Sequence, residues 1–391
     1  MNLSDTANTL LPLLRMGITV LLLALLPLAW WWLRQRGADP RSRLAALTAL
    51  TLFLTFDLIV FGAYTRLSDS GLGCPDWPGC YSQASPLAAH ADIAQAQATM
   101  PSGPVTHVKA WIEMVHRYLA MTVGLLIVLL AAAGWRARRS LPHSPWWGAA
   151  TLAWVIVQGL FGRYTVTLKL YPAIVSAHLL GGMVLLALLA WQYASLRGRP
   201  ASIGVAGRVI LAVLALVAVQ IALGGWVSSN YAVLACQGFP TCNGQWWPAM
   251  DAGHGFTVLR ELGRTDAGGF LPAQALVAIH LAHRVAALAV VAVLTWLVWR
   301  LARSGSAESR HGATILAGLM LLQIASGVSN VVLGWPLAAA LGHSAGAAAL
   351  VGLLTTLAWR PNAARHLSAL PAQAHTSESS RIAPWRQATL P

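Results

Sequence analysis

Four histidines lie inside long apolar stretches of this sequence: His116, His178, His283 and His343. Each follows the start of its stretch by roughly six to eight residues, so a helical rise of about 1.5 Å per residue places all four about 9–12 Å from the helix ends. Imidazole nitrogens bind transition metals and haem iron. A single histidine in an apolar helix is more often a hydrogen-bonded packing residue, but packing gives no reason for four at one depth.

The four histidines form two pairs, each of which could hold a haem. Two imidazoles that face each other across the core of a helix bundle can ligate haem iron from both sides. A zinc site would need a third or fourth ligand nearby, and only the first pair has a carboxylate close by. The pattern therefore predicts two haem sites, one with His116 and His178 and one with His283 and His343.

A carboxylate distinguishes the first pair from the second. Glu113 precedes His116 by one helical turn, so both side chains share a face of the helix. At the matching place before His283 the sequence has His280. A carboxylate beside a buried macrocycle could move protons or stabilise developing positive charge; alternatively, Glu113 only pairs with an arginine or with Lys109. The asymmetry suggests that one haem is a substrate and the other an electron-transfer cofactor.

Arginines directly follow the first histidine of each pair, at Arg117 and Arg284. An unpaired guanidinium inside a membrane is costly, and the propionates of a haem could neutralise it through bidentate hydrogen bonds. These arginines are therefore candidate propionate partners. The alternative is that their long stems extend towards the membrane surface and leave the charge in water.

Four cysteines form two closely spaced pairs, Cys74 with Cys80 and Cys236 with Cys242, in loops predicted to face outwards. An oxidising exterior allows disulfides. Four cysteines permit three pairings, of which we favour one bridge within each pair, pinning the loop over the adjacent haem site. A thiol–metal site is the alternative. The sequence contains no C-x-x-C-H motif, which disfavours covalent haem attachment, and it leaves the roles of His280 and of the loop histidines open.

The composition shows what kind of scaffold holds these residues. The chain has 391 residues, of which 57% are hydrophobic and only 10% are charged, whereas a soluble domain has about 25% charged residues. The sequence therefore predicts an all-α polytopic membrane protein. Nine apolar stretches are long enough to span a bilayer. They lie roughly at 16–34, 44–66, 108–134, 146–167, 173–195, 207–229, 275–301, 313–333 and 336–359.

The net charge of +14 comes from short basic clusters between apolar stretches. Such clusters orient membrane helices, and they differ from the basic stripe between aromatics that nucleic-acid binding requires. Their distribution predicts a periplasmic amino terminus and a cytoplasmic carboxyl terminus in a bacterial inner membrane. The first stretch has no small-residue cleavage site, so we expect a retained helix rather than a signal peptide. The tail from about residue 361 has no apolar periodicity and is expected to be disordered.

An internal repeat explains the paired motifs. Residues 62–80 overlie 224–242 at an offset of 162, and HRYLA overlies HRVAA at an offset of 167. QGLFGRYTV overlies QIASGVSNV, and HLLGG overlies HSAGA, both at an offset of 165. The sequence thus predicts two pseudo-symmetric four-helix bundles in a parallel repeat, plus one extra amino-terminal helix. The expected segments are 1–43 for the extra helix and its basic loop, 44–200 and 201–360 for the two halves, and 361–391 for the tail.

These motifs, taken in order, resemble those of the haem A synthase family of terminal-oxidase assembly. The likeness covers roughly residues 44–360 and includes TRLSDSGLGCPDWPGC, WIEMVHR, QGLFGRYTV, HLLGG and the second-half cysteine pair with HLAHR. The cysteine pairs in both halves look like the bacterial form that carries disulfides. The extra first helix departs from the family's eight-helix pattern.

The resemblance implies a specific reaction and a division of labour. Such an enzyme oxidises the C8 methyl of haem O, through an alcohol, to the formyl group of haem A. His116 and His178 would hold the substrate haem, His283 and His343 would ligate the iron of a haem b cofactor, and Glu113 would be the catalytic carboxylate. The implied partners are haem O, haem O synthase, the terminal oxidase under assembly and a membrane electron carrier.

Two other functions fit parts of the sequence. A di-haem b electron carrier, of the quinol or ferric reductase type, would account for the histidines, but carriers usually stack their haems at different depths. A transporter with a parallel repeat would account for the two halves but not for the paired histidines, and it would usually contain helices broken near mid-membrane. We therefore favour the synthase.

Overall fold

The computed structural model describes residues 3–198 and 205–359, so the predicted disordered tail lies outside the described residues. Within these residues the chain forms helices and isolated β-bridges but no strand, which confirms the all-α prediction. The long helices are α1 (Leu3–Arg34), α2 (Pro40–Leu67), α4 (His107–Arg136), α5 (Trp146–Thr167), α6 (Pro172–Arg197), α7 (Gly207–Ser229), α9 (Ala273–Ala302), α10 (Ala307–Val332) and α11 (Leu337–Ala358). The short ones are α3 (His90–Thr99), α8 (Ala252–Gly255) and the 3₁₀ turn Ala232–Leu234.

Among the described residues, 8 helices are long and apolar enough to cross a membrane. In a bilayer a helix satisfies its own backbone hydrogen bonds, and these eight helices make the chain a multi-pass membrane protein. The ninth predicted stretch, 146–167, forms α5, which is 22 residues long but not among the eight. Its Gln158 and Arg163 make it less apolar than expected. It nevertheless packs against both α4 and α6.

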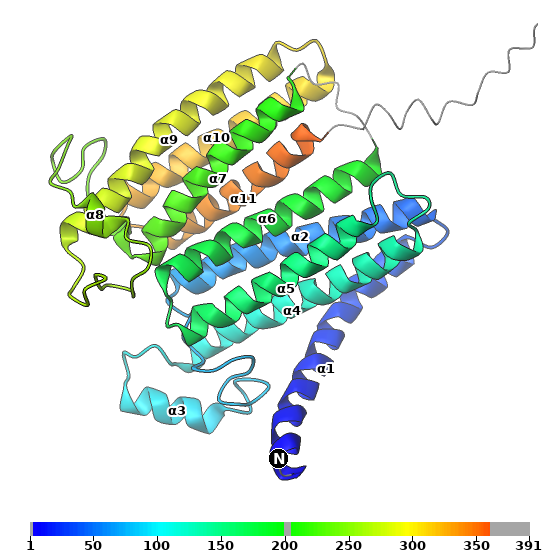
Figure 1. Cartoon of the computed structure of the whole chain (residues 1–391), viewed down its shortest axis with the longest axis horizontal. Helices are drawn as coiled ribbons and strands as arrows, with labels where there is room; N and C mark the ends of the chain where they lie inside the picture. Colours follow the sequence, from blue (N-terminus) through cyan, green and yellow to red (C-terminus); the bar gives the residue numbers. More distant parts are fainter. Residues whose placement is uncertain (1–2, 199–204, 360–391) are drawn as a thin grey trace, which may run out of the picture.

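Eight long helices form two groups with the same internal order (Figure 1). In the first group, α2 packs against α4, α4 against α5, α5 against α6, and α6 against α2. In the second group, α7, α9, α10 and α11 close a ring in the same way. The groups meet where α11 packs against α2 and α6, and where α6 packs against α7. Because α2 and α7 are repeat equivalents, as are α6 and α11, this junction is itself pseudo-symmetric.

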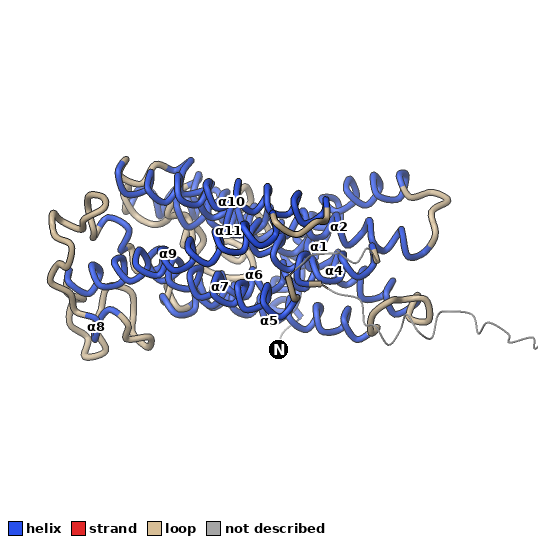
Figure 2. The backbone as a smooth tube through the Cα atoms, turned by 90° about the horizontal axis from the view of Figure 1, so that it is seen from above, coloured by secondary structure: helices blue, strands red, loops and turns tan. Residues whose placement is uncertain are grey.

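The helix connections divide the molecule into two ends. At one end, called here the disulfide end, both cysteine loops lie together with α3 and α8, on the left of Figure 1. In the view from above, much of the loop structure surrounds α8 (Figure 2). The opposite end, called here the arginine-rich end, contains the basic connections between α1 and α2, α4 and α5, and α9 and α10. Helix α1 packs against α4 and α2 through Met16, Val20 and Ala24, which are buried.

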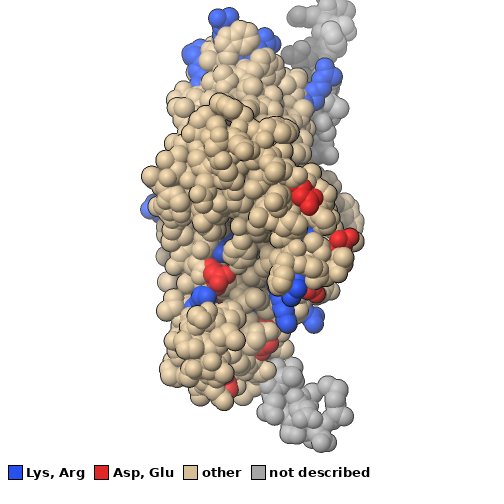
Figure 3. All heavy atoms as spheres, turned by 90° about the vertical axis from the view of Figure 1, so that its left-hand side faces the viewer, with Lys and Arg blue, Asp and Glu red and all other residues tan. Residues whose placement is uncertain are grey.

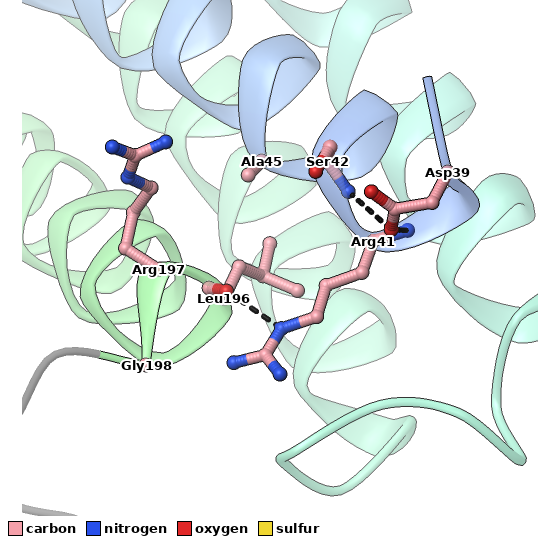
Figure 4. Close-up of a pocket in the computed structure, with 7 residues that line it drawn as sticks. All are labelled: Asp39, Arg41, Ser42, Ala45, Leu196, Arg197 and Gly198. Atoms are coloured by element: carbon pink, nitrogen blue, oxygen red, sulfur yellow. Dashed lines mark hydrogen bonds between the residues drawn. The ribbon is translucent and has the colours of Figure 1, made fainter. Parts of the chain in front are cut away.

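At the arginine-rich end, Arg41 ties α2 to α6. Asp39 caps α2 by accepting hydrogen bonds from the backbone N–H groups of Arg41 and Ser42, at 3.0 and 3.1 Å. The Nε of Arg41 donates to the carbonyl of Leu196 at 2.7 Å, where a positive charge is favoured by the dipole of α6. Figure 4 shows these residues around a shallow pocket. This pocket is at the other end of the helices from the four histidines, and it is a structural joint.

Candidate functional site

His283 and His343 face each other across the second group of helices. They come from α9 and α11, which are opposite corners of its ring, and their ring centroids are 6.5 Å apart with 79° between the planes. Two imidazoles that bind one metal from opposite sides, with metal–nitrogen bonds of about 2.0–2.1 Å, need ring centroids about 6–6.5 Å apart. Among the described residues there is no cluster of three or more metal-binding side chains. The pair therefore fits axial ligation of a haem and not a zinc site.

His116 and His178 occupy the matching corners of the first group, on α4 and α6. The His116 ring lies parallel to the Phe61 ring, with centroids 6.4 Å apart and 8° between the planes. His116 lies about two and a half helical turns from the start of α4 and His178 about two turns from the start of α6, so both are nearer the disulfide end. Both pairs are thus diagonal pairs near one end of their group.

A glycine on the neighbouring helix stands against each of the four imidazoles. A Cβ on Gly62 or Gly224 would lie 3.0 Å from the ring of His116 or His283. The corresponding distances are 3.5 Å from Gly162 to His178 and 3.3 Å from Gly327 to His343. Sequence reasoning missed these glycines, although they align with each other in the repeat. Their lack of a side chain leaves room for the rings and for a flat macrocycle beside them.

We expect Gly327→Ala to reduce haem binding in the second half by about tenfold, the low end of what disturbing a ligand's orientation costs. The added methyl must displace the His343 ring, which lies 3.3 Å from its position. Gly318→Ala is the matched control, because Gly318 lies on the same helix and a Cβ added there would have no neighbouring side chain or other helix within 4 Å. Both changes raise helix propensity equally. The haem-to-protein ratio of the purified variants measures the effect, and equal ratios would exclude this role for Gly327.

The carboxylate of Glu113 is buried beside the first histidine pair. One oxygen, Oε2, accepts a hydrogen bond from the backbone N–H of Cys74 at 2.8 Å, and Oε1 accepts one from Arg117 at 2.5 Å. Glu113 is only 3% exposed. Glu113 therefore forms an ion pair with Arg117, which is the alternative that the sequence left open. Lys109 pairs instead with Asp69, at 3.4 Å. Glu113 thus joins the helix turn before His116 to the first cysteine loop.

Arg117 and Arg284 use their guanidinium groups to hold the two cysteine loops. Arg117 donates to the carbonyls of Asp76, Pro78 and Gly79. Arg284 donates to Gly238 and Thr241 at 2.9 and 3.1 Å, and also to Cys236. Loop carbonyls thus surround both cations in the folded chain. Pairing with haem propionates remains a prediction for the N–H groups of Arg117 and Arg284 that do not bind loop carbonyls.

At the place of Glu113, the second half holds its loop with an imidazole. His280 is 4% exposed, its Nε2 accepts a hydrogen bond from Arg284 at 3.3 Å, and its Nδ1 is 3.1 Å from the carbonyl oxygen of Ala232. An imidazole needs no charge to make these contacts. Anchoring the loop therefore does not by itself require a carboxylate.

The cysteine loops have the same construction in both halves. Cys74 is bonded to Cys80 and Cys236 to Cys242, with S–S distances of 2.07 and 2.09 Å, which confirms one bridge within each pair. Each loop also contains a cis X–Pro bond at the matching proline, and each closes through a β-bridge from its second cysteine to the residue three positions later. Through Arg117 and Arg284, each closed loop fixes the helix turn that carries the first histidine of its pair.

Arg66 and Tyr231 join the two halves at the disulfide end. The Arg66 guanidinium lies 3.8 Å from the centroid of the Tyr231 ring and also donates to the carbonyl of Ser228. The Tyr231 hydroxyl donates to Asp69 at 2.8 Å. Burial raises the pKa of Tyr231, so its hydroxyl keeps the proton that it donates. This joint fixes the first half against the second on the side where the histidine pairs lie.

The known proteins that are similar to this chain all point to one family. The family model described as cytochrome oxidase assembly protein matches residues 45–355. A heme A synthase from Shewanella oneidensis is 39% identical over 323 residues, which cover 81% of this chain and 96% of that protein. A heme A synthase from Caulobacter sp. (strain K31) is 29% identical over 350 residues, covering 82% of this chain and 96% of that protein. The heme A synthase of Shouchella clausii is 31% identical over 218 residues, covering 53% and 65%.

Proposed function

Since the chain belongs to the COX15-CtaA family of cytochrome oxidase assembly proteins, we propose that it is a haem A synthase, a membrane oxidoreductase that converts haem O to haem A. The single structural observation that supports this most strongly is the repeated pair of opposed histidines, since the second pair has the ring separation that axial haem ligation needs. If water is the oxygen source, oxidation of a methyl group to a formyl group releases four electrons and four protons. The protein must therefore accept both.

In this proposal the first half binds haem O as the substrate. His116 and His178 orient it from opposite corners of the helix ring, and Gly62 and Gly162 leave room for it. Glu113 lies one turn before His116 on the same helix, where a carboxylate can accept protons released at the substrate. The two hydrogen bonds that Glu113 accepts fix its orientation. Because Glu113 is buried, a proton that it accepts is separated from bulk water.

The second half, in the same proposal, holds haem b between His283 and His343. When bound, haem b supplies one-electron transfer between the substrate and a membrane electron carrier. The residues of this half keep their ligands in place: Ser326 contacts the Nδ1 of His343 at 3.0 Å, and Gln220 contacts the Nδ1 of His283 at 3.1 Å. At the position equivalent to Glu113 the second half has His280 and no carboxylate. This is consistent with a site that transfers electrons and does not oxidise a methyl group.

We further propose that the disulfide end faces the periplasm of a bacterial inner membrane. Disulfides form in that oxidising compartment, and basic connections usually remain in the cytoplasm. Seen from the disulfide end, charged side chains are scattered over a mostly uncharged surface (Figure 3). The partners expected from the function are haem O synthase as the supplier, the terminal oxidase as the recipient, and a membrane electron carrier.

Extraction of pigments tests the proposal. The protein is purified after co-expression with a haem O synthase, and its haems are separated by chromatography. We expect haem b together with haem O and haem A. Haem b alone would instead indicate a di-haem electron carrier, and the absence of any haem would overturn both proposals. The position of both histidine pairs near one end already disfavours a carrier that relays electrons across the bilayer.

A further inference from the structure

The two equivalent histidines His178 and His343 differ in what contacts their Nδ1 atoms. The Nδ1 of His343 lies 3.0 Å from the Oγ of Ser326 on α10. The Nδ1 of His178 is buried and has no hydrogen-bond partner among the described residues. The offset of 165 that relates the two histidines also relates Ser326 to Phe161. One substitution between the halves therefore accounts for the difference.

The hydrogen bonds of Ser326 settle which group donates. A serine hydroxyl has one proton and two lone pairs. At 2.6 Å, the carbonyl of Leu322 is the closest acceptor for that proton, so the oxygen is left to accept from the Nδ1–H of His343. A histidine with its proton on Nδ1 has a free lone pair on Nε2. Ser326 thus fixes both the tautomer and the orientation that iron ligation requires.

The other contacts of the two pairs show the same trend. Gln323 donates to the backbone carbonyl of His343 at 3.0 Å, whereas Oε1 of its equivalent, Gln158, is buried without a partner among the described residues. Gln220 contacts His283, and the equivalent position in the first half is Leu58. Ser326, Gln220 and Gln323 thus contact the second pair of histidines, and at two of these three positions the first half has an apolar residue, Phe161 or Leu58.

We propose that Ser326 is a positioning residue that makes the second half retain its haem, and that Phe161 makes the first half able to release its haem. This inference rests on the proposed function, because a synthase must release a product but keep a cofactor. Partners of this kind, on the nitrogen that does not bind the metal, typically change metal affinity by about 10–100-fold. The difference between substrate and cofactor sites thus lies partly in the residues behind the ligands.

The test compares Ser326→Ala with Ser344→Ala. Ser344 lies next to His343, but among the described residues its hydroxyl bonds to the carbonyl of Ala340, at 3.2 Å, and to no other group. The purified, haem-loaded proteins are mixed with apomyoglobin, and haem b transfer is followed by absorbance. We expect Ser326→Ala to lose haem b about 10–100-fold faster and to show an altered midpoint potential. Ser344→Ala should match the wild type. Ser326→Thr should restore slow loss, because threonine also offers a hydroxyl.

The converse variant is Phe161→Ser, which places a hydroxyl behind His178. We expect it to slow the release of haem O and haem A to the same acceptor. The proposal is overturned if Ser326→Ala keeps both the loss rate and the potential of the wild type, or if Ser326→Thr loses haem b as fast as Ser326→Ala. If Phe161→Ser folds and releases haem O and haem A as fast as the wild type, the proposed role of Phe161 is wrong. Failure of the wild type to form haem A would count against the proposed function alone, because haem b retention is measured independently.

Discussion

Replacing Glu113 with glutamine is expected to abolish haem A formation while haem binding persists. Glutamine has nearly the shape of glutamate and keeps an oxygen that can accept the hydrogen bond of the Cys74 N–H, which is 2.8 Å from the carboxylate. It cannot accept a proton. Loss of a positioned acid or base lowers the rate by about 10²–10⁴-fold, so the haem A to haem b ratio should fall at least about 100-fold. Chromatography of the extracted haems measures that ratio.

A second variant separates proton transfer from loop anchoring. Glutamine leaves the Arg117 guanidinium, which is 8% exposed, without its carboxylate, and this could disturb the loop instead of the chemistry. Glu113→His copies the second half, where His280 accepts from Arg284 and contacts the loop without a carboxylate. We expect this variant to load haem normally and to remain inactive. Haem A output near the wild-type level from either variant would remove Glu113 from the mechanism.

The repeat made much of the architecture predictable. Charged and titratable groups are rare in apolar helices because burial in the membrane is costly, so the positions of the histidines and of Glu113 were visible in the sequence. The internal repeat then supplied the pairing of helices and the equivalence of the cysteine loops. The sequence left three cysteine pairings open, and the structure confirms the favoured one, a bridge within each pair.

The partners of individual side chains were not predictable. The sequence shows Arg117 and Arg284 next to the histidines but does not show the path of the cysteine loops, so the loop contacts of these arginines were missed, while their pairing with propionates remains a prediction. The folded loops bring backbone carbonyls to both cations. The glycines and Ser326 were missed for a related reason. Their role depends on which helix face meets the histidine ring, and the spacing within a single helix does not specify that.

Removing the imidazole of His283 is expected to eliminate most of the b-type spectrum. His283→Ala deletes one of the two proposed haem ligands, whose ring centroids are 6.5 Å apart, and no third metal-binding side chain clusters with them among the described residues. Because His116 and His178 belong to the other group of helices, haem O binding should persist. Reduced-minus-oxidised spectra and the haem content of the purified protein measure both effects. His311→Ala is the control, since His311 is exposed on α10 of the same half.

Added imidazole distinguishes the loss of a ligand from the loss of structure. The alanine variant has an opening of the size of the missing ring beside Gly224, whose own lack of a side chain keeps the opposite wall clear. Free imidazole can enter such an opening and bind the iron, so millimolar imidazole should restore the b-type spectrum of His283→Ala. A spectrum that survives the substitution unchanged would assign the ligand to another residue. A spectrum lost and not restored, in a protein that is unfolded by circular dichroism, would give His283 a packing role instead.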